Sequence, residues 1–244
     1  MTRASDLETL SIVIPAYNEE RRLPATLDRI LAYAERSPVP LREILVVDDG
    51  SRDGTAALAE ARGGIIRLVR NPGNRGKGYA VRQGMLAAAG DWILSTDADL
   101  SAPIEELEKL VATARRENAV VAIGSRALDR KLVKVHQPLM REISGRAFNV
   151  VMRLVTGLPF RDTQCGFKLF RRDAAREIFP RQVEDGFSFD VEDLLIAQAL
   201  GLRSIEVPVE WSNVEGTKVG LMQGIKSFAD LVRIRARAVR GDYK

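Results

Sequence analysis

Two aspartates one residue apart, Asp97 and Asp99, stand where the apolar run DWIL ends, in the segment LSTDADLSAP. Side chains at i and i+2 of an extended segment point to the same side, so these carboxylates would repel each other without a cation between them. Mg²⁺ and Mn²⁺ prefer hard oxygen ligands, commonly one or two carboxylates completed by substrate phosphates and water. The pair therefore indicates a divalent metal site, although such aspartates are equally typical of loops and helix caps.

Two further motifs have the chemistry of a nucleotide site. In VVDDGS, Asp48 and Asp49 offer carboxylates that can accept N–H bonds from a base or meet ribose hydroxyls, although an Asp-Gly turn has the same sequence. In NRGKGYA, Arg75 and Lys77 stand among small residues just before a predicted helix. That arrangement suits a diphosphate at a helix N-terminus and is also typical of a solvated glycine-rich turn.

The first half of the chain alternates short apolar strands with helical patterns, which predicts an α/β fold with a mostly parallel central sheet covered by helices. The predicted strands are 10–16, 43–49, 65–69, 91–97 and 119–125, and the predicted helices are 19–36, 54–62, 77–89 and 103–117. Ligands of such sheets bind beyond the carboxyl ends of the strands, which is where the aspartate motifs fall.

The second half predicts fewer strands and more helices, within the same single domain. We expect a loop at 127–137, helices at 138–156, 172–179, 189–200 and 220–240, and strands at 165–172 and 203–211. The domain then divides into a nucleotide-sugar-binding half at about 10–125, an acceptor-binding half at about 126–218, and a C-terminal amphipathic helix at about 219–240.

Composition narrows the class of protein further. The 244 residues are 45% hydrophobic and 29% charged with a net charge of +4, which is ordinary for a globular domain. A single cysteine excludes an intramolecular disulfide and fits a reducing compartment. No signal peptide or membrane span is predicted, so membrane contact would be peripheral. Nucleic acid is not expected as a partner, because the basic residues do not gather around aromatic ones.

The order and spacing of IPAYNEE, VVDDGSRDGT, NRGKG and TDADLS resemble inverting family 2 glycosyltransferases, which have the GT-A fold. The later motifs GSR, RDTQCGFKLF, FDVE and WSNVEGTK are similar to the dolichyl-phosphate β-glucosyltransferase branch, a relative of the dolichyl-phosphate mannose synthases. Mannose synthases carry a glutamine two residues after the second metal aspartate, where this chain has Ser101. The resemblance covers roughly residues 11–237.

The resemblance also implies roles for individual residues. A metal ion, Mg²⁺ or Mn²⁺, would be held by Asp97 and Asp99. The nucleotide-sugar donor would contact Pro15, Tyr17, Glu19, Asp48, Asp49, Lys77, Asp97 and Lys218. The acceptor phosphate would meet Arg126, Arg141 and Arg146. Catalysis would depend on Asp99, Asp190 and Arg126, with Asp190 acting either as a base or as an orienting group.

The implied activity is transfer of one hexose, with glucose preferred, from a UDP-sugar to a polyprenyl or dolichyl phosphate with inversion. A GDP-mannose-dependent mannose synthase and a family 2 enzyme with a non-polyprenyl acceptor remain alternatives. A phosphate monoester is already ionised near neutral pH, so such an acceptor needs cations more than a base.

A lipid acceptor raises the question of membrane contact. In the terminal helix, Leu221, Ile225, Phe228 and Val232 recur at helical spacing, and a second stripe holds Lys226, Arg233, Arg237 and Arg240. Residues 138–156 have a similar pattern. These helices are predicted either to lie at an anionic membrane surface or to pack in the core with a solvated basic edge. We expect a cytoplasmic protein on the cytoplasmic face of a membrane, attached directly or through a membrane-protein partner.

Overall fold

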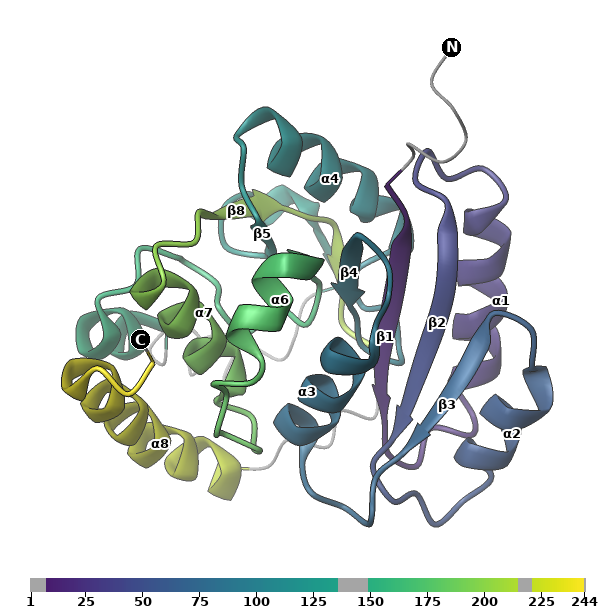
Figure 1. Ribbon diagram of the computed structural model, residues 1–244, viewed down its shortest axis with the longest axis horizontal. Helices are drawn as coiled ribbons and strands as arrows, with labels where there is room; N and C mark the ends of the chain where they lie inside the picture. Colours follow the sequence, from purple (N-terminus) through teal and green to yellow (C-terminus); the bar gives the residue numbers. More distant parts are fainter. Residues whose placement is uncertain (1–7, 136–148, 215–220, 244) are drawn as a thin grey trace.

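The computed structural model describes residues 8–135, 149–214 and 221–243 and contains a seven-stranded sheet with helices on both faces (Figure 1). The strand order is β3-β2-β1-β4-β7-β5-β8. Six of these strands run in the same direction, and β7 is antiparallel to both of its neighbours, β4 and β5. The predicted α/β architecture with a mostly parallel sheet is therefore confirmed.

The first half follows the predicted alternation closely. Its elements are β1 Leu10–Ala16, α1 Leu23–Ala34, β2 Leu41–Asp48, α2 Thr55–Arg62, β3 Ile66–Arg70, α3 Lys77–Ala87, β4 Trp92–Ser95, the 3₁₀ turn η2 Ile104–Glu106, α4 Leu107–Arg116 and β5 Val121–Ser125. The helix predicted at 103–117 thus opens as a 3₁₀ turn after Pro103. The short strand β4 ends at Ser95, two residues before Asp97.

The second half adds elements that the sequence pattern does not indicate. Its elements are the 3₁₀ turn η3 Arg130–Leu132, β6 Val133–Val135, a helix at 149–156, β7 Lys168–Arg171, α6 Arg172–Ile178, α7 Phe189–Ala199, β8 Ser204–Pro208, β9 Trp211–Ser212 and α8 Leu221–Arg240. The predicted loop at 127–137 is wrong in part, because β6 pairs with β9 in a small second sheet. The strand predicted at 203–211 is likewise divided, since β8 ends at Pro208.

The strands bury both faces, which explains their continuous apolar sequences. Along β1, Ile12 and Ile14 point into one core cluster and Val13 into the other. Helices α1, α2 and α4 cover the first cluster, and α3, α6, α7 and α8 cover the second. The carboxyl ends of β1, β2, β4 and β5 are thereby left open, and each of these strands leads into a motif identified from the sequence.

Helix α3 packs very closely on the sheet, and Gly84 makes this approach possible. A Cβ at this position would lie 2.3 Å from Cγ1 of Val13 and 2.8 Å from Cγ2 of Val47, which are side chains of β1 and β2. Any larger residue would push α3 away from the strands. Since Lys77 begins this helix, the packing of Gly84 also fixes where Lys77 stands.

We expect Gly84→Ala to lower the free energy of unfolding by about 1–3 kcal/mol, the usual cost of overfilling a packed core. Urea unfolding monitored by circular dichroism measures this change. The control is Leu86→Ala on the exposed side of the same helix, which should stay within about 0.5 kcal/mol of the parent. Equal stability of the Gly84→Ala variant and the parent would contradict this account of the packing.

Candidate active site

Asp97 is the centre of the candidate site and is surrounded by cations. Its Oδ1 lies 2.6 Å from Nζ of Lys77, the first residue of α3. Burial opposes ionisation of Asp97, but the positive charges of Lys77, Lys168 and Arg126 outweigh it and lower the pKa of this carboxyl. Burial likewise opposes the charge of Lys77, and Asp97 followed by Asp190 raises the pKa of the ammonium. Asp97 is therefore an anion with several cationic neighbours.

Gly166 forms a floor beneath the Asp97 carboxylate. A Cβ on Gly166 would lie only 2.3 Å from Oδ2 of Asp97, so the carboxylate occupies the space that any side chain would need. A small cavity opens beside it, lined in part by Thr96, Cys165 and Trp211. The loop that precedes β7 thus shapes the surroundings of an aspartate that follows β4.

Asp99 lies in a turn rather than on an extended segment. Its Oδ1 accepts the backbone N–H of Ser101 at 3.0 Å, and its Oδ2 is 3.9 Å from Nη1 of Arg22. Leu100, which lies between Asp99 and Ser101, has a positive φ of 46°. The extended geometry assumed from the sequence is therefore wrong, because the chain leaves the strand at Ser95 and turns.

The two aspartates have the chemistry that a divalent metal needs. They offer hard carboxylate oxygens at the open edge of the sheet, and Asp97 and Ser101 line a small cavity there. Within the described residues there is no group of three histidine, cysteine or acidic side chains placed to hold a metal ion. Two protein carboxylates completed by substrate phosphates and water are a common arrangement for Mg²⁺, so the residues present fit the ion.

Asp49 organises the glycine-rich loop before α3. This side chain is 4% exposed, and its carboxylate accepts N–H bonds from Gly76 at 2.8 Å and Arg75 at 3.1 Å and from the amide of Asn71 at 2.9 Å. The backbone of Gly50, at a φ of +73°, approaches Gly73 so closely that a Cβ would lie 2.6 Å from it. Asp49 therefore holds the loop that presents Lys77.

The loops that follow β1 and β2 are tied to each other. The backbone N–H of Asn18 donates to Ser51 Oγ, and that of Glu19 donates to Thr55 Oγ1. The Glu19 carboxylate in turn accepts two bonds of 2.7 Å from the guanidinium of Arg22. The predicted donor residues of this region therefore lie at the ends of β1 and β2, Pro15 and Asp48, or in the joined loops that follow them, Tyr17, Glu19 and Asp49.

Arg126 follows β5 and is held from behind by a buried carboxylate. Its Nε and Nη2 lie 2.6 Å and 2.8 Å from the oxygens of Asp162, which is 2% exposed. The guanidinium also lies over the indole of Trp211, 5.4 Å from the ring centroid. Burial raises the pKa of Asp162, but the Arg126 charge outweighs it and holds that pKa below its usual value. Arg126 is therefore a fixed, charged group beside Asp97.

Three predicted site residues, Arg141, Arg146 and Lys218, lie outside the described residues. The structure brings together Lys77, Asp97 and Arg126 through the interactions above, and it adds Asp190 through Lys168. Sequence reasoning gave no role to Lys168, Asp162, Gly166 or Arg22. Asp162, Gly166 and Lys168 all lie in the motif RDTQCGFKLF, and the lysine inside an apolar strand was the available signal.

Comparison with known proteins decides the family. The profile of Glycosyl transferase family 2 matches residues 11–179. A dolichyl-phosphate β-glucosyltransferase of Trichomonas vaginalis is 39% identical over 237 residues, covering 92% of this chain and 70% of the relative. The chain belongs to glycosyl transferase family 2. The human dolichyl-phosphate β-glucosyltransferase is 35% identical, with 98% of this chain and 79% of the relative covered.

Solved structures agree with the family 2 assignment at the level of the fold. Glucosyl-3-phosphoglycerate synthase of Mycobacterium tuberculosis, crystallised with Mn²⁺, UDP-glucose and phosphoglyceric acid, has a TM-score of 0.68 at 20% identity. The alignment covers 94% of this chain and 80% of that one. This likeness confirms the GT-A architecture predicted for the chain.

A buried ion pair sits behind the site of this family 2 enzyme. Lys168 on β7 is 2% exposed; it donates to the carbonyl of Cys165 at 2.5 Å and pairs with Asp190 in the first turn of α7. Burial raises the pKa of Asp190 even though Lys168 and Lys77 oppose the change. Asp190 is 5% exposed, so its carboxylate is committed to Lys168.

Two further acids of α7 are fully enclosed. Glu192 accepts the backbone N–H groups of Val183 and Glu184 and the hydroxyl of Tyr243, which joins the end of the chain to α7. Asp193 is 1% exposed, and within the described residues its Oδ1 has no hydrogen-bond partner. Burial raises the pKa of Asp193 well above its usual value, and the nearby charges of Asp190 and Glu192 raise it further.

The raised pKa of Asp193 makes stability depend on pH. Above the ordinary carboxyl pKa the unfolded chain releases this proton while the folded chain keeps it, so the free energy of unfolding falls as pH rises toward the folded-state pKa. Asp193→Asn removes that fall. We expect its Tm relative to the parent to increase from acid to neutral pH, measured by thermal denaturation at several pH values.

The matched control is Asp129→Asn, which changes an exposed aspartate that caps η3. Its Tm relative to the parent should not increase with pH. If the Asp193→Asn difference stayed constant or shrank as pH rises, Asp193 would be ionised in the folded protein.

Proposed function

We propose that this chain transfers glucose from UDP-glucose to a dolichyl or related polyprenyl phosphate, with inversion at the anomeric carbon. The observation that carries this proposal is the fixed guanidinium of Arg126 next to the Asp97 site, held bidentately by the buried Asp162. A cation set beside a donor site suits an acceptor that is itself a phosphate. The names of the relatives, dolichyl-phosphate β-glucosyltransferases over more than nine-tenths of this chain, support the same acceptor and sugar.

Asp97 and Asp99 are the residues that would hold Mg²⁺ or Mn²⁺ in this enzyme. When bound, the metal neutralises charge on the departing nucleoside diphosphate. The strand ends and joined loops that carry Pro15, Tyr17, Glu19 and Asp48 would surround the nucleotide, and Asp49 acts by holding the loop of Lys77. Lys218 and the acceptor residues Arg141 and Arg146 complete the proposed donor and acceptor contacts.

The acceptor chemistry decides between the two roles considered for Asp190. A phosphate monoester is ionised near neutral pH and can attack without a general base. Asp190 is also poorly placed to take a proton, because it is buried and paired with Lys168. We therefore assign Asp190 to orienting Lys168 behind Asp97, while Arg126 binds the phosphate.

The Lys77 ammonium can pair with either of two anions, the carboxylate of Asp97 or the diphosphate of the donor. Without a donor its ammonium pairs with Asp97 at 2.6 Å, the same carboxylate that would serve the metal. If Asp97 held a metal ion, Lys77 would lose its counter-ion, and the diphosphate of the donor would be the anion available to replace it. Metal and nucleotide should therefore bind cooperatively, with Lys77 passing from the protein carboxylate to the phosphate.

We expect Lys77→Met to bind Mn²⁺ more tightly than the parent when no nucleotide is present, by about fivefold or more, and to bind UDP more weakly. Electron paramagnetic resonance of free Mn²⁺ and calorimetry of UDP binding measure the two affinities. Lys109→Met is the control, since it removes a lysine of α4 from its 2.7 Å pair with Glu106 of η2. An unchanged Mn²⁺ affinity in Lys77→Met would exclude the exchange.

The transfer assay tests the function itself. Purified protein with Mg²⁺ or Mn²⁺ receives labelled UDP-glucose, GDP-mannose or UDP-N-acetylglucosamine and a short-chain polyprenyl phosphate, and the label extracted into organic solvent is counted. We expect transfer from UDP-glucose, and a loss of about a hundredfold or more in Asp99→Ala, because the metal loses a ligand. The control Asp28→Ala changes an exposed aspartate of α1 and should keep full activity.

Each other outcome of this assay has a definite meaning. Transfer from GDP-mannose would identify a mannose synthase. Tight UDP binding without transfer to the polyprenyl phosphate would point to a family 2 enzyme with another acceptor. A lipid acceptor also implies a peripheral position on the cytoplasmic face of a membrane, with attachment either direct or through a membrane protein.

A further inference from the structure

Exposed aliphatic side chains gather on two helices of the second half. Among the described residues, the four most exposed large hydrophobic side chains are Leu154 at 80%, Val239 at 71%, Val232 at 63% and Val150 at 56%. Leu154 and Val150 belong to the helix at 149–156, and Val232 and Val239 belong to α8. Single exposed aliphatics are ordinary on a protein surface, but a concentration of the most exposed ones marks an interaction site.

Both helices pack on the same part of the core. The inner side of the helix at 149–156 buries Met152, and the inner side of α8 buries Leu231 and Ile234, all in one core cluster. In Figure 1 the two helices lie near each other at the end of the molecule opposite α2 and β3. Each helix thus turns an outward side to solvent at this end of the molecule, and we call these two sides together the aliphatic face: Val150, Leu154, Val232 and Val239.

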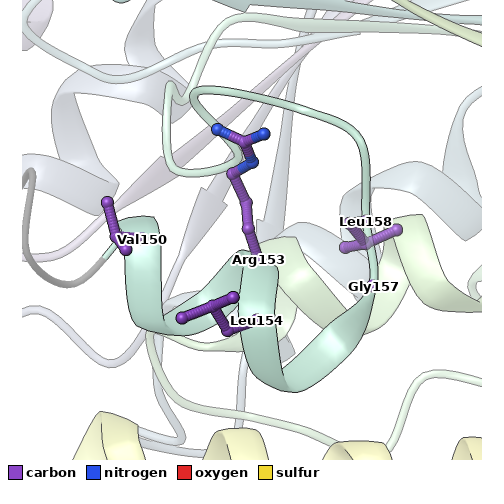
Figure 2. A pocket seen from close by; sticks show the side chains of 5 residues that line it. All are labelled: Val150, Arg153, Leu154, Gly157 and Leu158. Carbon is purple, nitrogen blue, oxygen red and sulfur yellow. The ribbon is translucent and has the colours of Figure 1, made fainter.

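A groove lies in the part of the aliphatic face that the helix at 149–156 forms. It has a volume of about 320 Å³ and is lined by Val150, Arg153, Leu154, Gly157 and Leu158. Figure 2 shows Val150 and Leu154 on one side of this groove and Leu158 on the other, with the side chain of Arg153 extending between them. Aliphatic walls with a guanidinium among them suit a partner that has both hydrocarbon and anionic groups.

Arginines border the aliphatic face on both helices. Arg153 is exposed on the helix at 149–156, and Arg233, Arg235 and Arg240 are exposed on α8. Arg233 pairs with the buried Asp230 and Arg240 with the exposed Asp242, and since Arg153 and Arg235 add two further positive charges, the outward charge of this surface is positive. Aliphatic side chains among arginines on a helix face are typical of proteins that lie on anionic bilayers.

The outward side of α8 differs from the one that the sequence pattern indicates. Val232 was placed on an apolar stripe with Leu221, Ile225 and Phe228, but the core of the described part of α8 is formed by Leu231 and Ile234, and Val232 faces solvent. Arg237 was placed on the basic stripe, yet it turns inward to lie 3.6 Å from Glu192. Core packing therefore explains one side of the described part of α8, and the other side exposes Val232 and Val239 to solvent.

The aliphatic face lies close along the chain to the acceptor cation. The six residues from Gly157 to Asp162 lead from the end of the helix at 149–156 to the carboxylate that holds Arg126. Even fully extended, this segment spans no more than about 20 Å. A surface that settled on a bilayer here would keep Arg126 within reach of lipid headgroups.

We propose that the aliphatic face docks on an anionic lipid bilayer, with Val150, Leu154, Val232 and Val239 entering the headgroup boundary and the arginines meeting lipid phosphates. This inference rests on the proposed function, because a lipid acceptor requires the site to work at a membrane. The bilayer is favoured over a second copy of the chain because the face combines outward positive charge with its aliphatic side chains, and two copies would bring like charges together.

The first test is vesicle co-sedimentation of the whole chain. We expect binding to vesicles of phosphatidylcholine with phosphatidylglycerol, weaker binding to phosphatidylcholine alone, and release by salt. The double variant Leu154→Asp/Val239→Asp should bind at least roughly tenfold less, because it places charges where the hydrocarbon boundary would be. The matched control Leu58→Asp/Ile65→Asp changes two exposed aliphatics at the opposite end of the molecule and should bind as the parent does.

Circular dichroism and Tm must show that both double variants fold as the parent does, which is expected because all four side chains are exposed. Vesicle binding that survives in folded Leu154→Asp/Val239→Asp would overturn the proposal, as would a folded parent that binds no vesicles. A parent dimer that this variant dissociates, without vesicle binding, would assign the aliphatic face to a second copy.

A second measurement separates this inference from the proposed function. With a short-chain, water-soluble acceptor, Leu154→Asp/Val239→Asp should transfer glucose as fast as the parent, whereas transfer to a long-chain acceptor in vesicles should fall with binding. Equal loss on both acceptors would mean that the face belongs to the catalytic site rather than to membrane docking. If the parent transferred nothing to either acceptor, the proposed function would fail whatever the vesicle result.

Discussion

Charge compensation around Asp97 is the constraint on which the rest of the site depends. A carboxylate in this partly buried position is stable as an anion because of the positive charges of Lys77, Lys168 and Arg126. Two of these cations have a second carboxylate of their own, since Asp162 holds Arg126 and Asp190 holds Lys168. Cations and anions therefore alternate through the site, and removing one member leaves a partner buried without compensation. The network draws on both halves of the chain, so neither half forms the site alone.

Much of the fold and part of the site follow from local sequence. The strands of the first half are short apolar runs, and their carboxyl ends bring Asp48, Asp97 and Arg126 to one edge of the sheet, as the sequence predicts. Lys77 at the start of α3 was also predictable, because the glycine-rich segment before a helix is a local signal. What these positions share is that each is determined by the few residues around it.

The remainder depends on contacts between distant segments, which leave no local pattern. Nothing within KLFR indicates that β7 runs antiparallel between β4 and β5, or that Lys168 turns toward Asp190. Asp162 binds Arg126 although 36 positions separate the two residues in the chain. Glycine is needed at 166 only because the carboxylate of Asp97 lies against it. The outward side of α8 was misassigned for the same reason, since a helical pattern with apolar residues on several sides does not say which side meets the core.

The antiparallel strand β7 has a consequence for how the molecule is made. During synthesis β2, β3 and β4 each leave the ribosome after a strand with which they pair, but β5 comes before the strand that joins it to them. Until residues 168–171 emerge, the open edge of β4 and the whole of β5 offer unpaired backbone groups to other chains. The nascent protein therefore passes through a stage in which its half-built sheet is prone to aggregation, and chaperone protection should matter most in the interval between β5 and β7.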